Sequence, residues 1–208
     1  MTIHRLFSKD PNDEEENVTQ NIYVFRFILF CIIVYSFEML LNSVDIFIVD
    51  KTIFTRGYVT GCLFAAVYVL ILLHLGLEHP LTKYVSITAV SLIIMAASVS
   101  LTYHMIIIIM MPIIIAGMYT SKQLSIYTFV LTVLSIIIST YAGYYGVCDA
   151  NMVLLTTTSM NHLVENGTFL LNQVNENPGV TLALYYVLPR CLMAMSFVYV
   201  SNIVNQVI

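Results

Sequence analysis

The longest stretch of this chain without a charged side chain runs from residue 84 to residue 121, between Lys83 and Lys122. One straight helix of these 38 residues would rise about 57 Å at about 1.5 Å per residue. The hydrocarbon core of a bilayer is only about 30 Å thick and takes about 20 residues. Tyr103 and His104, the most polar interior point, lie at the midpoint of the stretch. The pattern therefore predicts a transmembrane hairpin that turns at these two residues.

Apolar segments of helix length recur on both sides of this hairpin. The fourth segment is short, and it reaches bilayer thickness only when Tyr103, His104 and residues 119–122 are included. The fold class we predict is an all-α polytopic membrane bundle of about six transmembrane helices. The expected spans are Ile22–Leu41, Gly57–Leu77, Tyr84–Leu101, Met105–Met118, Leu124–Tyr145 and Val180–Ile203.

The placement of Lys and Arg predicts the orientation, because cytoplasmic loops of membrane proteins are enriched in these residues. With the N terminus inside, Arg5, Lys9, Lys83 and Lys122 fall in the cytoplasm and two cationic side chains fall outside. The longest connection, residues 146–179, contains Asp and Glu but no Lys or Arg. We expect a multi-pass protein of a bacterial cytoplasmic (inner) membrane with both termini in the cytoplasm.

This topology divides the chain into three regions. Residues 1–21 form an acidic cytoplasmic segment, which includes Asp13 and the three Glu residues that follow it. Residues 22–205 form the six-helix transmembrane domain, with an extracytoplasmic loop at about 147–178. Residues 206–208 are the cytoplasmic end.

The composition supports a membrane location and excludes other classes. Hydrophobic residues make up 59% of the chain and charged residues only 10%, against about 25% charged in soluble domains. The net charge is −4, so there is no basic patch for nucleic acid. The lipid bilayer is the partner that the composition predicts.

Four ionisable side chains lie within the expected spans, namely Arg26, Glu38, His74 and Arg190. Charges at this depth are costly and often functional. We expect Arg26 to reach the interface as an anchor and His74 to make a structural hydrogen bond. Glu38 lies in the outer part of span one, and Arg190 follows Pro189 near the middle of span six. These two residues predict either a buried structural pair or a ligand site, in which Arg190 would suit an anionic or carboxylate group.

A second group of polar side chains gathers at the predicted outer surface. Tyr103 and His104 form the hairpin turn, and Tyr144 and Asp149 lie where span five emerges. Aromatic rings beside carboxylates suit a small cation or polar metabolite, although tyrosines also collect at membrane interfaces without any ligand. The hypothetical ligand site comprises Glu38, Tyr103, His104, Tyr144, Asp149 and Arg190.

Small residues recur every four positions on the second span, at Gly57, Gly61 and Ala65. This spacing lets two helices approach closely. The pattern fits packing inside one bundle and dimerisation equally well.

The sequence lacks the motifs of several chemistries. It contains no P-loop, no Gly-rich nucleotide fingerprint, no H-E-x-x-H and no Cys or His cluster with metal-ligand spacing. We therefore predict no catalytic residue, no metal site and no cofactor within this chain.

The segment YHMIIIIMMPIIIAGMYTSKQLSIYTFVLTVLSIIIS, followed by YAGYYGVCDANMVLLTT, resembles the six-span N-terminal region of some Firmicutes diguanylate cyclases. The resemblance is best over Tyr103–Thr158 and looser over Ile22–Leu101. The matching positions are Tyr103, His104, Pro112, Tyr119, Tyr144, Cys148, Asp149, Ala150 and Asn151.

In those proteins a cytoplasmic GGDEF domain follows the last span, whereas this sequence contains no Gly-Gly-Asp/Glu-Glu-Phe segment. The resemblance implies a sensor or anchor portion that signals as a homodimer to an output domain fused to, or associated with, its C terminus. It implies no synthesis of cyclic di-GMP by this chain itself. The rival interpretations are a component of a small-solute transporter or channel, and a membrane assembly subunit.

Overall fold

The computed structural model describes residues 6–7, 16–46, 50–101, 105, 107–144 and 178–207. Within these residues the protein is all-α, with no β-strand. The elements in chain order are α2 (Glu16–Ser43), α3 (Lys51–Leu75), α4 (Thr82–Leu101), the 3-10 turn η3 (Ile108–Met110), α5 (Met111–Gly117), α6 (Lys122–Tyr144), α8 (Pro178–Leu182), the π-helical turn η6 (Ala183–Val187) and α9 (Leu188–Val207).

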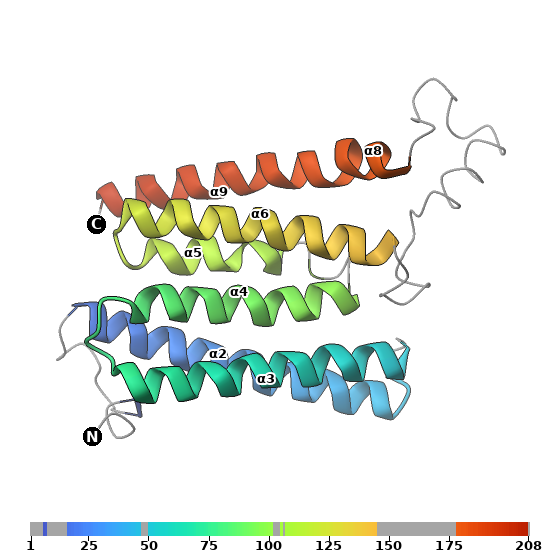
Figure 1. Cartoon of the computed structure of the whole chain (residues 1–208), viewed down its shortest axis with the longest axis horizontal. Helices are drawn as coiled ribbons and strands as arrows, with labels where there is room; N and C mark the ends of the chain where they lie inside the picture. The colour runs from blue at the N-terminus through green and yellow to red at the C-terminus, as the bar shows by residue number, and fades with distance from the viewer. Residues whose placement is uncertain are drawn as a thin grey trace.

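The helices lie side by side along one axis, with α4 in the middle of the bundle (Figure 1). Helix α4 packs against α2, α3, α5 and α6, and α9 packs against α5 and α6. The helix pair α2–α3 therefore lies on one side of α4, and α5, α6 and α9 lie on the other (Figure 1). The first turn of α2 and the last turn of α9 are at the same end of the bundle (Figure 1).

Four helices among the described residues are long and apolar enough to cross a membrane: Asn17–Ser43, Lys51–Leu75, Thr82–Leu101 and Lys122–Ala142. Helices of this length and composition indicate a multi-pass membrane protein. The expected fourth span is shorter than predicted, because its apolar helix covers only Ile108–Gly117. Ten residues rise about 15 Å, which is half of a bilayer core. Four of the six predicted spans thus correspond to helices long and apolar enough to cross a membrane, and the total of six stays a prediction.

Burial separates a central helix from peripheral ones. In the most apolar window of each helix, 67% of the α4 residues are buried, against 22% in α2 and 17% in α3. Apolar side chains on the outer faces of α2 and α3, such as Phe30, Ile33 and Leu70, are exposed. Exposed apolar faces on helices of this length are what a lipid environment requires.

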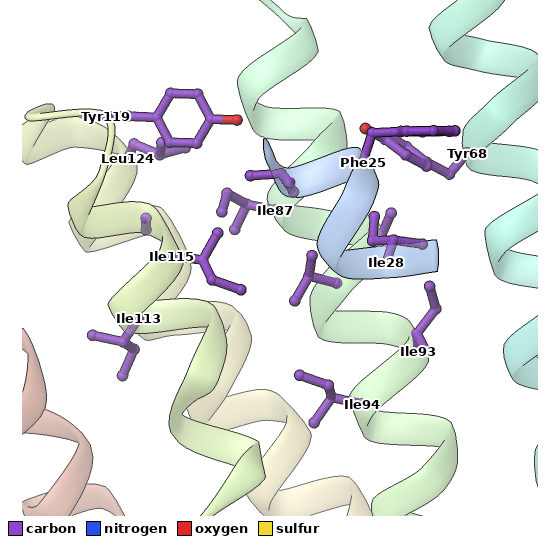
Figure 2. Close-up of a cluster of buried hydrophobic side chains, with 14 of the residues drawn as sticks. Phe25, Ile28, Tyr68, Ile87, Ile93, Ile94, Ile113, Ile115, Tyr119 and Leu124 are labelled. Carbon is purple, nitrogen blue, oxygen red and sulfur yellow. The ribbon is translucent and has the colours of Figure 1, made fainter. Parts of the chain in front are cut away.

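The main core lies where α2, α3, α4, α5 and α6 meet. Figure 2 shows Ile87, Ile93 and Ile94 of α4 in one cluster with Phe25 and Ile28 of α2 and with side chains from α5. Isoleucine and leucine dominate this cluster, so its packing is apolar across most of the membrane depth. Polar contacts between the described helices are few, such as Thr88 Oγ1 with the Tyr127 hydroxyl at 2.7 Å and the Tyr68 hydroxyl with Ser86 Oγ at 3.1 Å.

Two helices begin earlier than the apolar pattern predicted. Helix α2 starts at Glu16 and α3 at Lys51, six residues ahead of the expected Ile22 and Gly57 in each case. The start of α3 is stabilised by Asp50, whose side chain accepts a hydrogen bond from the Ile53 N–H at 2.9 Å. The predicted starts were placed at the first residues of the apolar runs. Polar residues that cap or extend a helix lie before such a run, so both starts were predicted too late.

Candidate ligand site

A cavity of about 310 Å³ lies between α2, α4 and the start of α5. Helix α2 contributes side chains at positions i, i+3, i+4, i+7, i+8 and i+11, which share one face of a helix. Helix α4 contributes Ile93, Ile94 and Ala97, and Met105, Ile107, Ile108 and Met111 close the third side. We call this cavity the α2 slot. Its α2 wall consists of Phe27, Phe30, Cys31, Val34, Tyr35 and Glu38.

Of the described residues that line the α2 slot, Glu38 alone has an acidic or basic side chain. It is half-buried, and in the described part of the chain its carboxylate has no hydrogen bond or ion pair. An ionised carboxylate in apolar surroundings is costly unless a partner compensates it. A polar ligand or a bound proton would compensate the charge of Glu38 in this cavity.

Tyr35 forms the boundary between the α2 slot and α3. Its ring makes edge contacts with Phe54 and Tyr58 of α3, with centroid distances of 5.3 and 5.4 Å. The Tyr58 hydroxyl also lies 2.9 Å from Ser36 Oγ on α2. These contacts hold α2 against α3 on the side of the slot away from α5.

The small residues of α3 lie inside this bundle. Gly57 is buried where α3 crosses α4, and a Cβ there would clash with the Ser100 hydroxyl and lie 2.8 Å from the Tyr35 hydroxyl. A Cβ at Gly61 would lie 3.5 Å from the Tyr35 ring, which is an ordinary contact. Ala65 is half-buried and packs against the main core. All three positions thus serve contacts within one chain, and Gly57 is the one where the space is closed.

Arg190 points toward α6 rather than α2. Its Nη1 donates to Thr140 Oγ1 at 3.1 Å, and the guanidinium lies over the Tyr186 ring at 5.6 Å. No ion pair joins Arg190 to Glu38 in the described residues. The physical reason is that α4, α5 and α6 lie between α2 and α9 (Figure 1). Glu38 and Arg190 therefore do not form the buried structural pair that was one of the two predictions for them.

The remaining residues of the predicted outer site lie largely outside the described part. Tyr103, His104 and Asp149 are not described, and Tyr144 is described only as the last residue of α6. Among the described neighbours, the Tyr141 hydroxyl donates to the Gly179 carbonyl at 2.9 Å, which connects the end of α6 to the start of α8. Of the predicted ligand residues that the structure describes, Glu38 alone lines a cavity.

The other two ionisable residues of the predicted spans, Arg26 and His74, lie away from the α2 slot. Arg26 donates through Nε to the Leu6 carbonyl at 3.2 Å, and His74 is exposed near the end of α3. Neither residue lines the α2 slot. No group of three His, Cys, Asp or Glu side chains in the described residues is arranged to hold a metal ion.

A polar cluster that the sequence reasoning missed lies at the opposite end of α2. Asn21 donates to the Leu77 carbonyl at 2.8 Å and accepts from the Tyr119 hydroxyl at 2.8 Å. Gln20 donates to the Met118 carbonyl at 2.5 Å. We call these contacts the polar clamp, because they join α2 to the α3–α4 connection and to the α5–α6 turn.

Burial raises the pKa of the Tyr119 phenol, which lies in the turn outside α5 and α6, and the proximity of Tyr68 adds to this effect. The Tyr119 hydroxyl therefore stays protonated and remains a donor to Asn21. The available signal in the sequence was that Asn21 shares a helix face with Phe25 and Ile28, four and seven residues later. That face is the buried one.

In comparisons with known proteins, no family model, no curated protein and no solved structure matches this chain. The class that the described residues support is an all-α protein with four helices long and apolar enough to cross a membrane.

Proposed function

We propose that this chain is the sensor or anchor module of a bacterial signalling protein and crosses the cytoplasmic membrane six times. Helices α8, η6 and α9 run without interruption from Pro178 to Val207, which is long enough for a fifth pass. The short helix Ile108–Gly117, together with the residues that flank it, would supply the remaining pass. An even number of passes returns the chain to the side on which it began. This agrees with the start of α2 and the end of α9, which lie at the same end of the bundle (Figure 1).

The observation that carries the sensor proposal is the α2 slot with Glu38 in its wall. The slot joins α2 to α4 and to the start of α5, two segments that are distant from α2 in the sequence, so a ligand inside it contacts all three. A ligand that binds one helix packing better than another shifts the population toward that packing. Such a shift is the input that a sensor module passes to its C-terminal helix.

The nature of the output rests on sequence resemblance alone. The likeness to the membrane region of diguanylate cyclases supports a cytoplasmic output domain fused to, or associated with, the C terminus, and a dimeric signalling unit. The end of α9 at the same side as the start of α2 is compatible with that arrangement (Figure 1).

A chimera tests this function. A known output domain that works only in the cytoplasm is fused after Ile208, and Glu38→Gln, His104→Ala and Arg190→Gln are introduced singly. Interhelical hydrogen bonds in membranes average about 0.6 kcal/mol and reach about 1.7, and we take the same range for a hydrogen bond between a bound ligand and Glu38. We therefore expect Glu38→Gln to change the output by about threefold to twentyfold, without loss of the inserted protein. Glu78→Gln, an exposed carboxylate at the other end of the bundle, is the matched control.

Two outcomes of this experiment count against the proposal. A well-inserted chimera with no output in any form would mean that the C terminus is not cytoplasmic. An unchanged output in all three variants, across different ligands and pH values, would mean that these residues only hold the bundle together.

A component of a solute transporter is the second candidate. The observation that favours it is the π-helical turn Ala183–Val187 directly before Pro189 and Arg190, because π-turns and interrupted helices often mark functional sites in membranes. Purified protein in liposomes discriminates between the two functions. The sensor proposal predicts no solute uptake above that of empty vesicles, whereas the transporter predicts uptake that Arg190→Gln reduces.

A further inference from the structure

The α2 slot is elongated along α2 and has different chemistry at its two ends. Its wall begins at Phe27 and ends at Glu38, eleven positions later, which is a length of about 16 Å. The Phe27 end is lined by aromatic and aliphatic side chains only, and the carboxylate lies at the other end. We propose that the α2 slot binds a single-chain amphiphile with its hydrocarbon tail along α2 and a protonated amine beside Glu38.

The depth of the two ends agrees with the way an amphiphile lies in a bilayer. Glu38 is five residues from Ser43, the last residue of α2, so it lies about 7.5 Å from the helix end. Phe27 lies toward the middle of the same helix. A ligand entering from the bilayer would keep its polar group near the interface and its tail in the hydrocarbon region. This inference rests on the proposed membrane insertion.

The size and shape of the slot suit one chain rather than two. Its volume of about 310 Å³ lies at the lower limit of ligand sites, which range from about 300 to 1,000 Å³. The exposed side chains Phe30 and Ile107 stand at its open side. That side would face lipid, so a hydrophobic ligand can enter without crossing water.

Charge complementarity selects the headgroup. Among the described residues no cationic side chain lines the slot, and the described cations near this end have other environments. Lys51 pairs with Asp45 at 2.8 Å, and Arg56 lines a separate groove between α3 and α4. An ammonium group would compensate the Glu38 carboxylate through a charge-assisted hydrogen bond. A sulfate or phosphate headgroup would find no cationic partner and would be repelled.

The test measures binding of two labelled chains to the full-length protein in phosphatidylcholine vesicles. The probes are a nitroxide-labelled twelve-carbon amine and the alcohol of the same chain, and electron paramagnetic resonance reports the immobilised fraction of each. The wild-type protein is expected to bind the amine about tenfold more strongly than the alcohol. Glu38→Gln should abolish this preference and leave alcohol binding unchanged. Glu78→Gln, far from the slot, should change neither.

A second variant tests the position of the tail. Val34 lines the slot and is partly exposed, so Val34→Trp can fill the cavity without disturbing the buried core. It should weaken binding of both probes. An amine preference that persists in Glu38→Gln, or binding of both probes that persists in Val34→Trp, overturns the proposal.

Carbonate extraction of the same vesicles separates this inference from the proposed function. A chain that is extracted into the aqueous phase contradicts membrane insertion and therefore the sensor module. A chain that stays in the membrane but shows no amine preference contradicts the amphiphile site alone.

Discussion

Replacing Gly57 with alanine is expected to lower the free energy of unfolding by about 1–3 kcal/mol, which is the usual cost of forcing extra volume into a packed interior. The added Cβ would clash with the Ser100 hydroxyl and lie 2.8 Å from the Tyr35 hydroxyl. Ser100 is buried and donates to the Ala96 carbonyl at 3.2 Å, and its own Cβ would lie 3.0 Å from the added atom, so rotation of the hydroxyl alone would not relieve the contact. The resulting strain must separate α3 from α4 or displace α2.

Unfolding of purified protein in detergent micelles, followed by circular dichroism, measures this effect. Gly61→Ala is the matched control, because its Cβ makes only an ordinary contact with the Tyr35 ring at 3.5 Å. It should leave stability unchanged or raise it by up to about 1 kcal/mol, because alanine is the better helix former. The double variant Gly57→Ala with Ser100→Gly should recover part of the loss. Equal stability of the Gly57→Ala and Gly61→Ala variants would contradict the close approach of α3 and α4.

Replacing Asn21 with alanine should destabilise the protein by about 2 kcal/mol, because the buried Leu77 carbonyl then loses its donor and the Tyr119 hydroxyl loses its acceptor. A buried polar group left without a partner costs more than the hydrogen bond itself contributed. The polar clamp joins three chain segments at one end of the bundle, so its loss should loosen the α3–α4 connection and the α5–α6 turn together.

A double-mutant cycle with Tyr119→Phe isolates the contact between the two side chains. We expect a coupling free energy of about 0.5–3 kcal/mol, which is the range for residues in one hydrogen-bonded network. Asn17→Ala, an exposed residue one turn earlier in α2, is the control and should leave stability unchanged. Additive effects of Asn21→Ala and Tyr119→Phe would show that the two side chains act independently.

The sequence was sufficient to predict that the protein is all-α and built from apolar helices. Each of the six predicted segments contains or overlaps a helix in the described structure. This succeeds because hydropathy over about 20 residues is a local property, and a bilayer forces each such segment to satisfy its own backbone hydrogen bonds. The helix starts at Glu16 and Lys51 were missed, because they depend on capping and on polar contacts.

The candidate site could be predicted only in part. The rarity of ionisable groups within the spans singled out Glu38, and the structure places it in a cavity wall. Its proposed neighbour Arg190 instead contacts Thr140, because the order of helices around α4 separates α2 from α9 (Figure 1). Which helices become neighbours is a long-range property, and six apolar segments of similar composition carry little information about it.

Asn21 and Gly57 are two further residues whose roles depend on tertiary packing and could not be predicted from the sequence. From the sequence, Asn21 belonged to a polar segment before the first span, and Gly57 belonged to a small-residue pattern with two equally good explanations. The tertiary structure buries Asn21 between two chain turns and closes α4 over Gly57. The sequence by itself therefore determined where helices form and that they suit a membrane, because those properties follow from local composition. Only the packing of distant segments decided which side chains meet, because that depends on the shape of every surface in contact.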